Sequence, residues 1–128
     1  MITFLDSPGG NVMGVQLSGA VAADDYRQLD VRLKHLIDLW GHVGIVVVFE
    51  EGATFNLGAR WAGTAIRLRH AGHVACLALV GPESLERQIR RRFALRFAQS
   101  RFFQVDQLNE AWAWAAQCGK EAAVKAAP

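Results

Sequence analysis

The chain has 128 residues, of which 52% are hydrophobic and 20% charged, and its formal net charge is +2. This length fits one domain and the apolar content can fill a core, so a two-domain chain and a disordered chain are both excluded. The longest apolar run, residues 45–49, is far shorter than the roughly 20 residues that cross a bilayer, which excludes a membrane-spanning helix. Residues 1–6 lack the features of a secretory signal, so we expect a cytoplasmic protein.

The first half of the chain predicts a hairpin, a helix and a buried strand. Residues 2–5 and 12–18 are expected to pair, because residues 7–11 form a dense turn signal. A helix is predicted over residues 24–39, where Asp24 and Asp25 favour the positive end of the helix dipole. Its apolar residues recur at spacings of three and four and are Tyr26, Leu29, Leu33, Leu36, Ile37 and Trp40. Residues 45–49 are β-branched without polar alternation, as is typical of a central strand.

The second half continues the alternation of helices and strands. Residues 50–56 read as a loop, and a second helix is expected from residue 57 to about 72. Residues 74–80 predict another buried strand, a third helix follows Pro82 as far as Phe97, and a last strand spans residues 101–105. Asp106 is expected to cap a fourth helix, and residues 118–128 to form a frayed tail after a domain over residues 1–117.

The resulting order is β-β-α-β-α-β-α-β-α. Helices between buried strands require a mostly parallel central sheet, to which the N-terminal hairpin adds an antiparallel edge. The sequence therefore predicts a single α/β domain.

The cysteines and histidines show no pattern of a metal or catalytic site. Cys76 lies in an apolar strand and Cys118 follows a helix-like segment near the end of the chain. There is no CxxC spacing and two such thiols do not imply a disulfide, so we interpret both as structural residues. His70 and His73 are close in sequence, but Gly72 separates them at a helix end. Nucleophile, zinc and P-loop motifs are absent, so we predict a non-enzymatic protein without cofactor or metal.

Charge is distributed unevenly along the chain. Residues 1–59 carry three basic against seven acidic residues, or −4, whereas residues 60–128 carry eleven against five, or +6. Such a field attracts an anionic membrane surface, a phosphate-bearing ligand or an acidic protein, while the simpler interpretation is a solvated helix face. The aromatic residues of the third helix belong to its inward stripe, so nucleic acid is not an expected partner. The opposite charge of the two halves suggests a homodimer.

Several segments resemble the SpoIIAA-like proteins, a bacterial family within the STAS group of sulfate-transporter and anti-sigma-factor-antagonist domains. These segments are MI at 1–2, GAVAADDY at 19–26, NLGARW at 56–61, RLRH at 67–70, RFF at 101–103 and AWAW at 111–114. The resemblance covers about residues 1–117 and implies a STAS-like fold. SpoIIAA-like proteins are similar to lipid-binding CRAL-TRIO domains and have been thought to bind hydrophobic ligands or membranes. The resemblance therefore implies a binding function of this kind.

The same resemblance implies a phosphorylation switch, but the chain lacks its serine. In STAS domains a kinase modifies a Ser at the start of the helix after the central strand. The matching loop here offers Thr54 without the Asp-Ser-Gly setting, so we interpret Thr54 as a loop or capping residue.

The second helix and its preceding loop are the predicted binding site. Gly58 and Gly63 weaken this helix by roughly a kcal/mol each, so it is expected to detach easily from the sheet. A mobile helix of this kind either uncovers an apolar pocket or lies on an anionic membrane surface. In the second case we expect peripheral association with the inner membrane. The competing interpretation is that its apolar residues simply pack on the sheet. The candidate residues are Phe55, Leu57, Trp61 and Leu68 for apolar contact and Arg60, Arg67 and Arg69 for phosphate.

The alternative function is a protein-interaction module in a regulatory pathway. Here the basic face of the third helix meets an acidic regulatory protein, and no ligand enters the domain. Arg87, Arg90, Arg91, Arg92 and Arg96 form that face.

Overall fold

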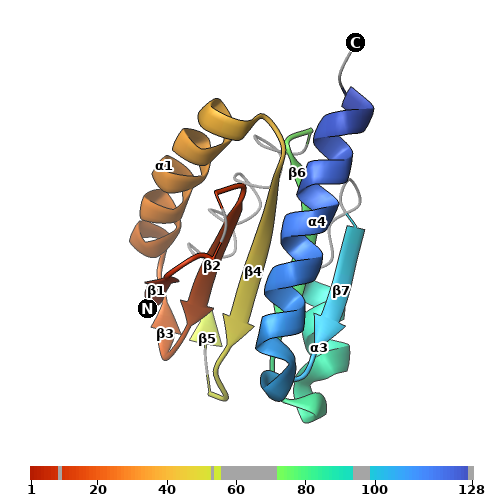
Figure 1. Cartoon of the computed structure of the whole chain (residues 1–128). Coiled ribbons are helices and arrows are strands. Elements are labelled where there is room, and N and C mark those ends of the chain that lie inside the picture. Colours follow the sequence, from red (N-terminus) through yellow and green to blue (C-terminus); the bar gives the residue numbers. More distant parts are fainter. Residues whose placement is uncertain (9, 53, 56–71, 94–98, 127–128) are drawn as a thin grey trace.

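The computed structural model describes residues 1–8, 10–52, 54–55, 72–93 and 99–126. The predicted second helix falls almost wholly on residues that are not described; elsewhere the helices and strands follow the predicted order, with two additional two-residue strands (Figure 1). The strands are β1 (Ile2–Leu5), β2 (Val12–Leu17), β3 (Ala20–Val21), β4 (Val43–Phe49), β5 (Thr54–Phe55), β6 (Val74–Val80) and β7 (Gln99–Phe103). The helices are α1 (Ala23–Trp40), α3 (Glu86–Phe93) and α4 (Leu108–Ala126), with short 3-10 turns η1 (Glu83–Leu85) and η2 (Val105–Gln107).

The main sheet has five strands in the order β1-β2-β4-β6-β7. β1 pairs with β2 in antiparallel fashion, with Phe4 opposite Val15, and every other neighbouring pair is parallel. The α/β class and the antiparallel N-terminal hairpin are therefore confirmed. β4 and β6 occupy the centre and are almost wholly buried, because apolar side chains on both strand faces must be covered by other elements.

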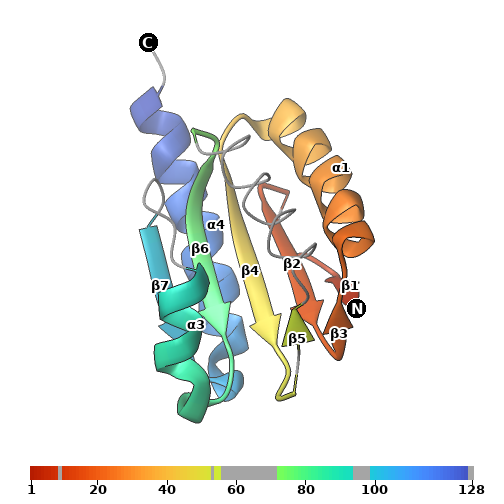
Figure 2. The same ribbon diagram turned by 180° about the vertical axis from the view of Figure 1, so that it is seen from behind.

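Helices cover both faces of this sheet and create two apolar cores. One core joins Leu33 of α1 and Ile89, at the start of α3, to the strands, while the other joins Trp112 and Ala115 of α4 to the opposite face. Figure 2 shows α3 in front of the sheet and α4 behind it. The molecule is a three-layer α/β/α arrangement.

The loop predicted at residues 50–56 contains a short strand. β5 pairs in parallel with β3, with Ala20 opposite Thr54, and forms a separate two-stranded sheet. A two-residue strand is too short to show any periodicity, which is why the sequence predicts a loop here. The last strand also begins earlier than expected, at Gln99, and ends at Phe103.

α4 lies unusually close to the sheet because glycines face it. A Cβ built on Gly44 would lie 2.4 Å from the carbonyl oxygen of Ala115, and one built on Gly14 would lie 2.1 Å from the indole ring of Trp112. Both distances are shorter than real Cβ contacts, so neither position accepts a side chain without movement. The backbone of the helix thus rests almost directly on β4.

The C-terminal helix is longer than the sequence predicts. α4 continues to Ala126 instead of giving way to a frayed tail at residue 118. Cys118 is buried, and the Asn11 side-chain amide donates a 3.0 Å hydrogen bond to the Ala116 carbonyl oxygen. These contacts with β6 and with the β1–β2 turn stabilise the last helical turns of α4. The alanine-rich sequence of this segment does not by itself decide whether it is helical.

Cys76 and Cys118, both interpreted as structural residues, form a disulfide that the sequence did not imply. Their Cα atoms are 6.1 Å apart, within the range that a disulfide spans, and 42 positions separate them in the sequence. The bond joins β6 to α4 and lies in the core, with Cys76 fully buried. Sequence spacing carried no sign of it, since the pairing arises from the packing of α4 on the sheet.

Reduction of this disulfide is expected to lower stability. A cross-link that closes a loop of this length restricts the unfolded chain and contributes about 2–4 kcal/mol to the free energy of unfolding. Denaturant unfolding of the oxidised protein, of the reduced protein and of the Cys76→Ala/Cys118→Ala double variant measures the loss. The last two should agree, and quantitative labelling of both thiols in the native, unreduced protein would contradict the bond.

The close approach of α4 predicts a sharp difference between two glycine substitutions. Gly44→Ala drives a methyl group into the Ala115 carbonyl and should destabilise the protein by about 1–3 kcal/mol, as overpacking does. Gly72→Ala is the matched control, because a Cβ there meets no described atom within 4 Å. Thermal unfolding followed by circular dichroism measures both, and equal melting temperatures for the two variants would show that α4 does not lie against β4.

Candidate functional site: a cavity between the hairpin and α1

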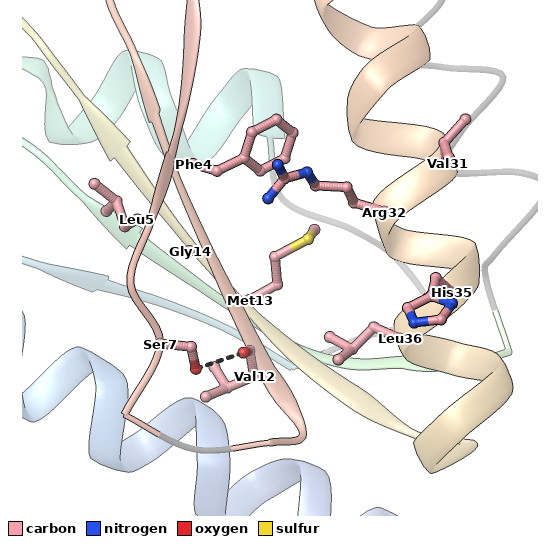
Figure 3. A pocket seen from close by; sticks show the side chains of 10 residues that line it. All are labelled: Phe4, Leu5, Ser7, Val12, Met13, Gly14, Val31, Arg32, His35 and Leu36. Carbon is pink, nitrogen blue, oxygen red and sulfur yellow. Dashed lines mark hydrogen bonds between the residues drawn. The ribbon is translucent and has the colours of Figure 1, made fainter.

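A cavity of about 510 Å³ lies between the N-terminal hairpin and α1 (Figure 3). Its volume falls within the range of about 300–1,000 Å³ that is usual for small-molecule sites. We call it the hairpin cavity. Its lining residues are Phe4, Leu5, Ser7, Val12, Met13, Gly14, Val31, Arg32, His35 and Leu36.

The hairpin supplies an apolar floor to this cavity. Side chains alternate between the two faces of a strand, so Phe4 and Met13 point towards α1 and belong to the core on that side. Figure 3 shows Met13 at the centre of the cavity, between the strand and Leu36 of the helix. The hydroxyl of Ser7 donates a 2.7 Å hydrogen bond to the Val12 carbonyl oxygen, which joins the two ends of the β1–β2 turn.

α1 supplies the opposite wall from one flank of the helix. Val31, Arg32, His35 and Leu36 share this flank because residues three and four apart lie on the same side of a helix, as Val31 and His35 do, and Arg32 and Leu36. Leu33 points instead into the core and is 1% exposed. Val31 is 70% exposed, which places a large apolar side chain at the mouth of the cavity.

Arg32 is the charged group of the hairpin cavity. Its guanidinium carbon lies 4.0 Å above the centroid of the Phe4 ring, a distance at which a cation is attracted to the aromatic face. In Figure 3 the side chain reaches from α1 across to β1. Within the part of the chain that the structure describes, no carboxylate forms an ion pair with it, whereas Arg27 pairs with Asp24 and Arg90 with Glu86.

The predicted site on the second helix lies outside the described residues. This concerns Leu57, Arg60, Trp61, Arg67, Leu68 and Arg69, none of which the structure describes. Phe55 is placed only through its backbone, which pairs with Val21 in the β3–β5 sheet. The role of these residues therefore stays a prediction.

Sequence reasoning missed the hairpin cavity, although one signal for it is present in the chain. Val31 falls off the inward stripe of α1, so its side chain is available to line a cavity beside the helix. The partner wall comes from residues 4–14, and no sequence pattern shows which flank of the helix they approach.

The structure pairs different histidines from those that are close in sequence. The rings of His42 and His73 lie 6.0 Å apart at the starts of β4 and β6, and His73 Nδ1 lies 3.0 Å from the Gly41 carbonyl oxygen. That oxygen can only accept, so Nδ1 carries the proton. Among the described residues no group of three metal-ligating side chains forms, and His70 lies outside them.

The outer face of α3 is basic where the structure describes it. Arg87, Arg90 and Arg91 are exposed, and Glu86 lies 3.6 Å from Arg90. Arg92 belongs to the helix without a described side chain, and Arg96 lies outside the described residues.

The comparisons with known proteins decide the family. A family model described as SpoIIAA-like matches residues 12–116, which is most of the chain. The chain belongs to the SpoIIAA-like family. Its fold is similar to that of an uncharacterized protein from Shewanella loihica whose crystal structure has a SpoIIAA-like fold. The TM-score is 0.68 at 16% identity, covering 91% of this chain and 93% of the other. No curated protein matches the chain.

Membership of the SpoIIAA-like family supports a regulatory or binding role in general. No helix in the described part of the chain is both long and apolar enough to cross a bilayer. The family assignment does not identify a ligand or a partner, so any proposal for them must be argued from the residues of the site.

Proposed function

We propose that this SpoIIAA-like domain is a non-enzymatic binding module that takes a small apolar ligand in the hairpin cavity. The observation that supports the proposal is a cavity of about 510 Å³ whose floor and walls are mainly apolar and whose mouth carries an exposed valine. Each methylene that a ligand buries in such a site contributes about 0.8 kcal/mol to binding. A hydrophobic ligand was expected at the second helix from the sequence, whereas the described residues that line this cavity belong to the hairpin and α1.

The strand order marks no ligand site at the edge of the described sheet. In open α/β sheets, substrates usually bind where the strand order reverses. Here β1, β2, β4, β6 and β7 follow one another across the sheet in chain order, so the described sheet has no such reversal. The apolar cavity at the hairpin is the better-supported site.

Blocking the mouth of the cavity should abolish ligand binding. Val31→Trp adds a large ring at the entrance without overpacking the core, because Val31 is exposed. We expect at least a tenfold loss of affinity for the neutral fluorescent probe N-phenyl-1-naphthylamine, measured by fluorescence titration. The loss corresponds to about 1.4 kcal/mol.

Leu39→Trp is the control for this experiment. Leu39 is similarly exposed, at 65%, on the same helix, but does not line the cavity. The control should bind the probe like the unmodified protein. Equal affinity in both variants, or no saturable binding by the unmodified protein, would rule out the proposed site.

A second candidate function is a docking module for an acidic regulatory protein. The observation that favours it is the row of exposed arginines on α3, of which only Arg90 has a described carboxylate neighbour. Peripheral membrane association through residues 57–69 and homodimer formation also remain predictions from the sequence.

Charge reversal on α3 separates the two candidates. Arg90→Glu should leave probe binding unchanged if the hairpin cavity is the functional site, since α3 does not line it. In the docking alternative the same variant should weaken capture of an acidic partner more than tenfold, with the effect reduced by salt. Pull-down from the host at two salt concentrations, with Val31→Trp in parallel, distinguishes these outcomes.

A further inference from the structure

We infer that the ligand of the hairpin cavity is an amphiphile whose polar end is a carboxylate held by Arg32. This inference rests on the proposed function and specifies the ligand that the cavity would select. It follows from the position of one cation in an otherwise largely apolar lining.

The first step is the placement of the guanidinium. Stacking on the Phe4 ring occupies one face of the group and leaves its N–H bonds in the plane free to donate. Among the described residues no acidic side chain takes those donors. A planar guanidinium with free donors forms two parallel hydrogen bonds with a carboxylate, so its geometry matches this anion.

The second step is the shape of the surrounding lining. Figure 3 shows Arg32 beside Phe4 at one side of the cavity, with Met13, Leu36 and Val12 extending away from it. A ligand whose anionic group meets Arg32 would therefore lay its hydrocarbon part over Met13. This arrangement fits an amphiphile with one polar end.

The third step separates a carboxylate from a phosphate. Among the lining residues that the structure describes, Arg32 alone has a permanent charge. A phosphate monoester carries nearly two charges and usually gathers several donors. The Ser7 hydroxyl already donates to the Val12 carbonyl oxygen, so it offers no proton to an anion in this arrangement.

The experiment compares decanoate with decanol as competitors of N-phenyl-1-naphthylamine. The two ligands share the same chain length and differ in the charged group. A carboxylate pays a larger hydration cost on binding, so a cavity without a cation favours the alcohol. The ratio of the decanol Kd to the decanoate Kd thus reports the contribution of the cation.

Arg32→Gln should lower this ratio by about tenfold or more, because hydrogen bonds to charged groups are the stronger class. Decanol affinity should stay within about twofold, which shows that the cavity is intact. Arg27→Gln is the matched control: it removes the same charge from α1 at a residue outside the lining, and should preserve the ratio.

An unchanged ratio in Arg32→Gln would overturn the carboxylate assignment while binding of decanol and the neutral probe still upholds the proposed function. Failure of all three probes to bind the unmodified protein would instead reject the cavity itself. Decyl phosphate binding more than tenfold tighter than decanoate would also overturn the assignment. The assignment would also be overturned if decanoate does not bind but the protein floats with anionic phospholipid vesicles and Arg32→Gln abolishes that flotation.

Discussion

The contact that fixes the arrangement of the layers is the seating of α4 directly on the sheet backbone. Gly14 and Gly44 present no side chain to the helix, so Trp112 and Ala115 reach the strands themselves. Gly119 extends the same seam, because a Cβ there would meet the Asn11 side chain at 2.9 Å. One helix thereby covers β2, β4 and β6 on this face, and the disulfide joins it to β6 near the C-terminal end of the seam. α1 and α3 are left to cover the opposite face.

The hairpin cavity is a consequence of how that opposite face is covered at its edge. α1 packs Leu33 and Tyr26 into the core, which fixes the rotation of the helix about its axis. With that rotation, the flank carrying Val31 and Arg32 faces the edge strand β1 and its turn. β1 has only four residues, so the hairpin fills this space incompletely. The Arg32 side chain crosses the space between α1 and β1 and stacks on Phe4.

The predictions that succeeded depend on local pattern, and those that failed depend on distance. The apolar runs of β4 and β6 and the stripe of α1 identify each element from its neighbours in sequence, so the α/β class and the hairpin follow from them. The disulfide requires α4 to lie over β6, and the extension of α4 to Ala126 requires contacts with Asn11. Both are tertiary effects that no spacing encodes. The cavity belongs to the same class, because Phe4 and Arg32 meet only after the hairpin and helix have packed.

The charge around the hairpin cavity restricts what can bind there. Residues 1–59 carry a net charge of −4, and α1 itself carries four acidic and three basic side chains. At physiological salt this charge is screened beyond about 8 Å, and its sign adds no attraction for a small free anion near the helix. A ligand that binds beside Arg32 must therefore gain most of its free energy from apolar burial over Met13 and Leu36. The guanidinium then acts on selection among apolar ligands, because it compensates the hydration that a carboxylate loses and an alcohol keeps. In the proposed binding mode, affinity and selectivity are thus divided between the hairpin floor and a single residue of α1.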